Sequence, residues 1–236
     1  MIAEGVHLAR EALLAGCDLE TVFFDARLST SEEGATLLAE LRDLDAPCHE
    51  VTEGVMEGLQ DARSPQPVLL AIRTAGLDGR SWRTQENPLV VVCDGIQDPG
   101  NLGAILRSAD AAGAAVLLAT GTTADWRHPR TVRASTGSIF RLPIEQTETE
   151  TAVERLRQHG LTLVGTTVRK GQDFRDVALT GGCALFFGGE GAGLDEGLLE
   201  TLDRVITIPL HPGVESLSVG AAVAVTLFEA VRQRRA

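Results

Sequence analysis

Residues 205–225, which read VITIPLHPGVESLSVGAAVAV, place polar side chains where an apolar strand gives way to a helix. The loop between the two carries Glu215, Ser216 and Ser218. The first N–H groups of a helix lack partners within the helix, so a ligand can be received there. A serine at this place is also an ordinary helix cap, so the segment predicts a binding loop without specifying its ligand.

Two further segments join a strand end to residues that could do chemistry. Residues 94–107, DGIQDPGNLGAILR, follow the strand LVVVC and contain Asn101, a candidate helix cap, and Arg107. Residues 185–194, LFFGGEGAGL, run from a buried strand into a glycine-rich loop with one acid, Glu190. Glycines let the backbone approach a ligand closely, and the acid favours a cationic or hydroxyl-bearing ligand over a phosphate. The patterns GxGxxG and GxxxxGK[ST] are absent from these segments, which argues against a dinucleotide site and a phosphate loop.

The charge of the chain is uneven. A net charge of −12 argues against a generic nucleic-acid binder. The segment 127–141 nevertheless holds a basic block without acids, which is either a solvated face or a surface for phosphates. The block consists of Arg127, Arg130, Arg133 and Arg141. Its arginines suit bidentate contacts to phosphate.

The remaining composition indicates a cytoplasmic protein. The four cysteines are far apart and lack zinc-ligand spacing, so we expect reduced thiols and no metal site. The first ten residues lack the pattern of a signal peptide. No apolar run approaches the roughly 18 residues of a membrane span.

The elements that must position these loops divide the chain into two α/β units. Residues 1–74 predict a small domain, residues 75–87 a polar linker, and residues 88–236 a larger domain. In the small domain we expect helices at 2–16, 31–44 and 53–60 and strands at 21–25, 48–51 and 68–73. In the larger domain we expect strands at 89–93, 115–119, 161–167, 183–187 and 204–208 and helices at 101–112, 129–136, 149–159, 195–202 and 217–234. Apolar strands that alternate with helices predict a parallel sheet covered on both faces, with the three loops at its carboxyl edge.

Together these residues resemble the SpoU (TrmH) family of RNA ribose 2′-O-methyltransferases in the SPOUT superfamily. The motifs of the family are matched in order by DPGNLGAILR at 98–107, GGEGAG at 188–193 and IPLHPGVESLSV at 208–219. The segment RASTGSIFRLPI at 133–144 is also similar to the family. The start of the chain, AEGVHLAREALLAG, resembles the small L30e-like substrate-binding domain found in many members.

The resemblance implies a SPOUT α/β fold with a parallel sheet and a C-terminal trefoil knot, preceded by the L30e-like domain. The knot would bring the second and third motifs together as the S-adenosylmethionine (AdoMet) pocket. Gly188, Ile208, Leu217 and Ser218 would contact this cofactor, largely through backbone groups. Ser218 stands where the family usually has Asn, and a hydroxyl makes fewer hydrogen bonds than an amide. We therefore expect one contact to be lost or to pass through water.

The implied reaction is the transfer of a methyl group from a sulfonium to a ribose 2′-hydroxyl, without a metal. It needs an aligned nucleophile and help in losing a proton. Arg107 matches the catalytic arginine of the family, and because a guanidinium stays protonated we expect it to bind phosphate and stabilise a developing alkoxide. Glu190 is the better candidate for the base, unless it pairs with Arg107. Asn101 is expected to orient Arg107 or cap its helix, and Ser216 to position the loop or the ribose.

The resemblance also implies partners. We expect a homodimer that associates through the alanine-rich C-terminal helix, and an RNA surface at the basic block. Ribosomal RNA is favoured over tRNA because the N-terminal domain resembles that of members acting on rRNA. The alternatives are a tRNA 2′-O-methyltransferase, a homologue that binds cofactor or RNA without catalysis, and a nucleotide-dependent oxidoreductase.

The chain begins almost inside the EG motif of the family, at Glu4 and Gly5. Two explanations stay open. Either the small domain lacks an edge element, or the start codon is assigned too far downstream.

Overall fold

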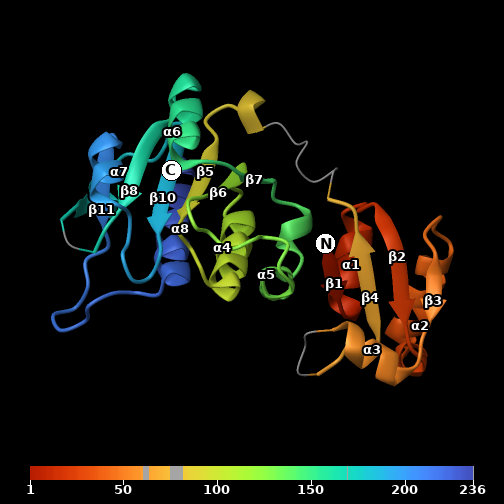
Figure 1. The fold of residues 1–236 in the computed structure, drawn as a ribbon. Helices are drawn as coiled ribbons and strands as arrows, with labels where there is room; N and C mark the ends of the chain where they lie inside the picture. The colour runs from red at the N-terminus through yellow and green to blue at the C-terminus, as the bar shows by residue number, and fades with distance from the viewer. Residues whose placement is uncertain (61–63, 75–81, 169, 236) are drawn as a thin grey trace.

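The computed structural model describes residues 1–60, 64–74, 82–168 and 170–235 of the 236-residue chain. They form two α/β domains, one at each end of the chain, each around its own sheet (Figure 1). The expected linker at 75–87 lies partly outside the described residues. Within the described ranges, no helix is long and apolar enough to cross a membrane.

The N-terminal domain has a four-stranded sheet with the strand order β1-β4-β2-β3. Strands β1 and β2 run antiparallel to β4, and β3 runs parallel to β2. The strands are β1 (Ile2–Glu4), β2 (Leu19–Phe24), β3 (Cys48–Glu50) and β4 (Val68–Ile72). The helices are α1 (Val6–Leu14), α2 (Glu32–Arg42) and α3 (Glu53–Leu59), with a short 3-10 helix η1 (Ala26–Thr30).

The expectation of a helix over residues 2–16 was wrong at its start. Residues Ile2–Glu4 form the edge strand β1 and pair with β4, and Gly5 with a φ of 98° separates this strand from α1. Apolar residues in so short a stretch fit the helical period as well as a strand. The free edge of β4 decides between the two, because it offers backbone hydrogen bonds to the start of the chain. The small domain therefore has an edge strand formed by its first residues.

The C-terminal domain has a seven-stranded sheet with the order β7-β6-β5-β10-β8-β11-β9. Every pairing in it is parallel, which confirms the predicted parallel sheet. The strands are β5 (Leu89–Asp94), β6 (Val116–Thr120), β7 (Ile144–Gln146), β8 (Thr162–Thr166), β9 (Gln172–Asp173), β10 (Cys183–Gly188) and β11 (Arg204–Thr207). The α-helices are α4 (Pro99–Ala111), α5 (Pro129–Ser135), α6 (Thr149–Gln158), α7 (Glu196–Thr201) and α8 (Val219–Arg235). The 3-10 helices are η2 (Trp82–Thr84), η3 (Ser138–Phe140) and η4 (Phe174–Asp176).

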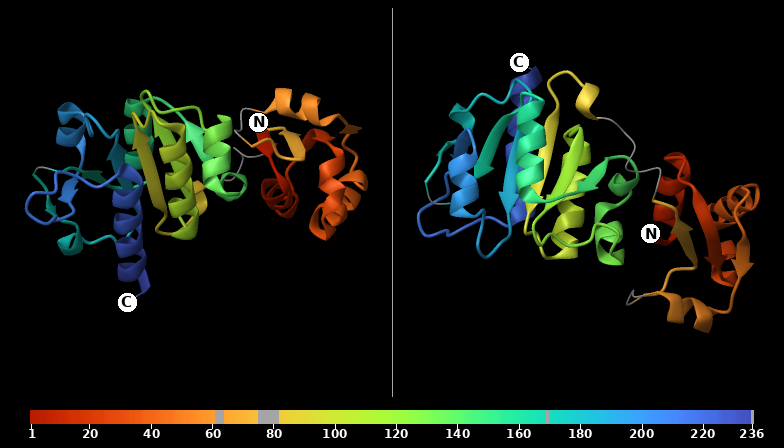
Figure 2. Two further views of the ribbon diagram at one scale, coloured as in Figure 1. Left: turned by 90° about the horizontal axis from the view of Figure 1, so that it is seen from below. Right: turned by 45° about the horizontal axis from the view of Figure 1, so that its top comes forward.

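Helices cover both faces of this sheet (Figure 2). Successive side chains of a strand point to opposite faces. Accordingly, Val91 and Cys93 pack in the cluster that includes residues of α4 and α8, while Val90 and Val92 pack in the cluster that includes residues of α6 and α7. Burial on both faces explains why the strands are continuous apolar runs. The edge strands β7 and β9 were not predicted, because they are too short to show a period.

The trefoil knot stays a prediction of the resemblance. The structure does place strand β5 between β6 and β10. It also packs the first turn of α8 against α4, where a Cβ added to Gly220 would lie 3.7 Å from the Cβ of Ala104.

Candidate active site

The first motif forms the start of α4. Asp98 caps this helix, since its Oδ1 accepts a hydrogen bond of 3.0 Å from the backbone N–H of Asn101. This bond and the guanidinium of Arg130 lower the pKa of Asp98. The proposed capping role of Asn101 was therefore wrong, because Asp98 already fills it. The side chain of Asn101 points elsewhere and donates from Nδ2 to Oε1 of Glu190 at 2.8 Å.

The second motif is a tight loop after β10. A Cβ added to Gly188 would lie 2.1 Å from the carbonyl carbon of Gly193, and one added to Gly189 would lie 2.4 Å from the carbonyl oxygen of Gly95. The N–H of Gly193 donates to the carbonyl of Gly189 at 2.9 Å and closes the loop. The chain passes so close to itself here that only glycine fits. This packing presents Glu190 at the rim, where it reaches Asn101.

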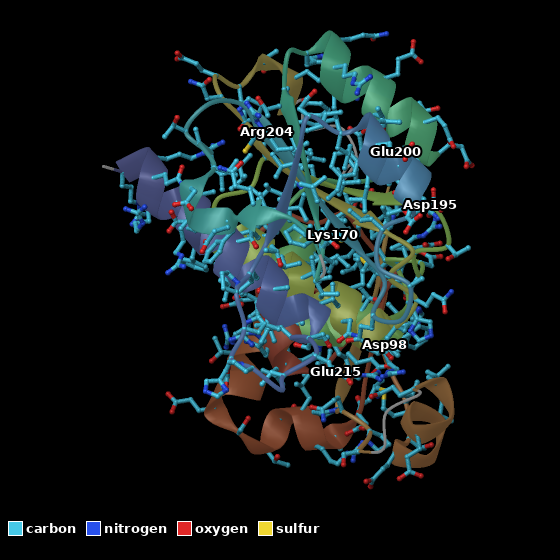
Figure 3. The ribbon with its side chains drawn as sticks, turned by 90° about the vertical axis from the view of Figure 1, so that its left-hand side faces the viewer. Asp98, Lys170, Asp195, Glu200, Arg204 and Glu215 are labelled. Atoms are coloured by element: carbon cyan, nitrogen blue, oxygen red, sulfur yellow. The ribbon has the colours of Figure 1, made fainter. Side chains whose placement is uncertain are left out.

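The third motif is the loop between β11 and α8. Residues 211–218 are all exposed. The hydroxyl of Ser218 accepts a hydrogen bond of 3.3 Å from the N–H of Ala221, so it acts as a cap at the start of α8. In the view of Figure 3, Glu215 lies on this loop, and Asp195 and Glu200 lie at the two ends of α7.

The second and third motifs line one cleft of about 850 Å³, within the range of roughly 300–1,000 Å³ that holds small ligands. The predicted residues that line it are Gly188, Glu190, Ile208, Ser216, Leu217 and Ser218. Arg107 does not line the cleft. It is exposed on α4, outside the cofactor motifs, as the sequence predicted. The alternative that Glu190 pairs with Arg107 is wrong, because no ion pair joins the two among the described residues and Glu190 binds Asn101 instead.

The cleft suits a nucleoside that carries a positive charge. Apolar side chains such as Ile208 and Leu217 can cover a base, and the rim bears the carboxylates of Glu190, Glu196 and Glu215. Among the residues that the structure describes, no basic side chain lines this cleft. The donor set therefore fits AdoMet, which combines an adenosine with a sulfonium cation.

Sequence reasoning missed the part of the cleft formed by the end of β8 and by α7. Thr166 ends β8, Thr167 and Val168 follow it, and Glu196 and Leu199 belong to α7. Strand β8 lies between β10 and β11, so its carboxyl end shares their edge of the sheet. The strand order would have identified these residues, but it cannot be read from periodicity.

The basic block is already engaged in ion pairs. Arg127 binds Asp125 at 2.9 Å, and Arg130 binds Asp98 at 3.3 Å. Arg133 and Arg141 instead reach carboxylates of the N-terminal domain, Glu4 and Glu11 respectively. Arg141 also binds Asp110 at 2.9 Å. The four arginines therefore do not form one open surface, and their contact with RNA stays a prediction.

Comparison with known proteins agrees with this site. Residues 88–228 match the SpoU rRNA Methylase family, and residues 1–70 match the MRM3-like substrate binding domain. The chain is 31% identical over 229 residues to the 23S rRNA (guanosine(2553)-2′-O)-methyltransferase RlmP of Bacillus subtilis, covering 96% of this chain and 86% of that protein. It is 36% identical over 198 residues to the 23S rRNA (guanosine-2′-O-)-methyltransferase RlmB of Pseudomonas putida, covering 84% of this chain and 77% of that protein.

The solved structures extend the match to the whole fold. The SpoU methyltransferase AviRb from Streptomyces viridochromogenes, in complex with AdoMet, superposes with a TM-score of 0.89 at 30% identity, covering 100% of this chain and 91% of that chain. These matches confirm the predicted cofactor and an RNA 2′-O-ribose methyltransferase. The chain therefore belongs to the SpoU rRNA methylase family, whose members use AdoMet to methylate RNA.

Proposed function

We propose that this chain methylates the ribose 2′-hydroxyl of a guanosine in 23S ribosomal RNA. The contact between Asn101 and Glu190 is the observation that carries the methyl-transfer part of this proposal, because it joins the first motif to the rim of the cleft. The names of the relatives RlmP and RlmB and the match of residues 1–70 to a substrate binding domain support rRNA over tRNA.

Each motif residue has a role that its position supports. When bound in the cleft, AdoMet would supply the electrophilic methyl group. Glu190 is at the rim, held by the amide of Asn101, and can accept the proton that the attacking 2′-hydroxyl loses. Arg107 is exposed on the same helix as Asn101 and can bind the adjacent phosphate and stabilise the developing alkoxide. Ser216 lines the cleft and can position the ribose, while Gly188, Ile208, Leu217 and Ser218, which also line it, would hold the cofactor.

A homodimer through α8 belongs to the same proposal. Val225 and Phe228 are 40% and 50% exposed on this helix, and Val214 and Leu217 of the preceding loop are 51% and 37% exposed. Large apolar side chains exposed on a monomer can mark an interface with a partner. Ala230, which the sequence placed at this contact, is fully buried in the core of its own domain. Sedimentation at micromolar concentration tests the dimer, and Phe228→Glu should shift a dimer to monomers.

Labelled AdoMet and purified RNAs test the activity. We expect methyl transfer to 23S rRNA that lacks its 2′-O-methyl groups, with the product mapped to a guanosine. Transfer to tRNA alone would support the tRNA alternative. Binding of AdoMet without transfer to any RNA would support a homologue without catalysis. A cytoplasmic location stays a prediction that fractionation of cells can test.

A further inference from the structure

A buried carboxylate of the N-terminal domain is neutralised by the catalytic domain. Glu4 ends β1, and its side chain is only 2% exposed. Its Oε2 accepts a hydrogen bond of 2.7 Å from Nη1 of Arg133 on α5. A buried charge is costly unless it is paired, so removing either partner weakens the contact between the domains. The chain therefore has an ion pair that is satisfied only when the two domains are docked.

A second ion pair lies beside the first. Arg141, which follows η3, binds Glu11 of α1 and also Asp110 of α4. Gly137, with a φ of 94°, passes so close to α1 that an added Cβ would lie 2.5 Å from Oε2 of Glu11. One continuous cluster of buried apolar side chains also includes residues of both domains. The docking surface thus combines close backbone approach, apolar packing and paired charge.

The docking surface is connected through α5 to α4, the helix that carries Asn101 and Arg107. A Cβ added to Gly103 of α4 would lie 2.5 Å from the Cβ of Ala134 on α5. The two helices therefore pack at the distance that only a small residue permits. The same α4 carries Asn101 and Arg107. A change in the position of α5 would have to be accommodated by the helix that holds the reacting groups.

We propose that Glu4 and Arg133 are positioning residues for the methyl transfer. Their ion pair holds the substrate-binding domain on α5, so that RNA bound by that domain reaches Arg107 in one register. This inference rests on the proposed function, and it assigns Arg133 to the domain contact rather than to phosphate. It predicts that Glu4, which would not itself contact RNA, affects the KM for RNA.

A double-mutant cycle separates the two assignments. Glu4→Gln and Arg133→Gln should each raise the KM for 23S rRNA by about tenfold, leave the Kd for AdoMet unchanged, and combine with little further loss. The charge swap E4R/R133E should recover part of the lost activity. If Glu4→Gln has no effect on KM, or if the two effects multiply, Arg133 acts on RNA and the proposal is overturned.

Two controls keep the result interpretable. Arg10→Gln changes the residue next to Glu11 on α1 but removes ion pairs with Glu33 and Glu40, both within the N-terminal domain, so it should leave KM unchanged. If the Glu4 variants do not fold, Glu11→Gln provides the same cycle with Arg141→Gln. Small-angle scattering reports docking independently of activity. The Gln variants should increase the radius of gyration, and an unchanged radius would overturn the domain contact even if the wild type methylates no RNA.

Discussion

Asn101 and Glu190 come from distant parts of the chain, yet Nδ2 of the amide lies 2.8 Å from Oε1 of the carboxylate. Each residue belongs to a different motif, and only the fold brings them together. An amide that donates to one carboxylate oxygen fixes the direction in which the other oxygen can accept a proton. The pair therefore couples α4, which carries Arg107, to the glycine-rich loop that lines the cleft.

Asn101→Ala should lower kcat without a matching loss of AdoMet affinity. The variant leaves Glu190 in place but removes the donor that orients it. Because positioned acid and base groups contribute about 10²–10⁴-fold, we expect kcat to fall by at least about tenfold. Single-turnover methylation and calorimetric titration of AdoMet measure the two quantities. An equal loss of kcat and of AdoMet affinity would mean that the Asn101–Glu190 pair acts in cofactor binding.

Arg107→Ala should nearly abolish methyl transfer and leave the affinity for S-adenosylhomocysteine within a few fold. Arg107 is exposed on α4 and lies outside the cofactor cleft. Its loss removes a cation from the developing alkoxide, an effect of the order of 10²–10³-fold for a single stabilising donor. A large loss of S-adenosylhomocysteine affinity in titration would instead place Arg107 in the cofactor site.

Asp98→Ala should destabilise the catalytic domain by about 1 kcal/mol, the typical value of a helix cap. The N–H of Asn101 lowers the pKa of Asp98 from its ordinary value of 3.8. The carboxylate therefore stabilises the fold above pH 3.8, and this contribution is lost as the pH falls through the lowered pKa. Asp98→Asn keeps a capping oxygen and is the matched control. Denaturant unfolding from pH 7 to pH 3 should show the difference between wild type and Asp98→Ala shrinking with acid.

Glu196→Gln and Glu215→Gln should weaken the binding of AdoMet more than the binding of S-adenosylhomocysteine. Both carboxylates line the cleft, and the two ligands differ in the positive charge of the sulfonium. The exposed rim screens the charges, so the ratio of the two affinities should change by only about two- to fivefold for each variant. Glu200→Gln on α7 lies outside the cleft and is the control. Competition titration would refute the idea if all three variants behaved alike.

Replacing Arg127 and Arg130 by Ala should weaken RNA binding and flatten its dependence on salt. Both side chains are about half exposed, and their ion pairs with Asp125 and Asp98 lie within the C-terminal domain. Each lost phosphate contact should reduce the salt slope by about 1, and distant acids are screened beyond roughly 8–10 Å. Filter binding between low and physiological salt measures the slope. An unchanged salt slope would mean that the arginines of the basic block form structural ion pairs and do not contact RNA phosphates.

The sequence predicted most of what repeats along the chain and less of what depends on contacts between distant segments. The parallel sheet was predicted from apolar strands, and the ligand-binding loops from glycine and serine at strand ends, while their assignment to AdoMet came from the family resemblance. The cap of α4 at Asp98, rather than Asn101, depended on which of two polar residues faces the first turn. The pairing of Arg133 with Glu4 and the contribution of α7 to the cleft could not be predicted, because they depend on the domain contact and the strand order.

The strand order also has a consequence for how the protein reaches its native state. The inner strand β5 pairs with β10, which the ribosome makes long after β5 and after several intervening helices and strands, among them α4 and β8. Sheets built from such distant pairings fold slowly, because the chain loses the entropy of closing a long loop before the strand pairing contributes any stabilisation. Until β10 is made, the apolar edge of β5 stays open to other chains. Correct assembly of this enzyme should therefore be most sensitive to temperature and chaperones during synthesis, long before any RNA is bound.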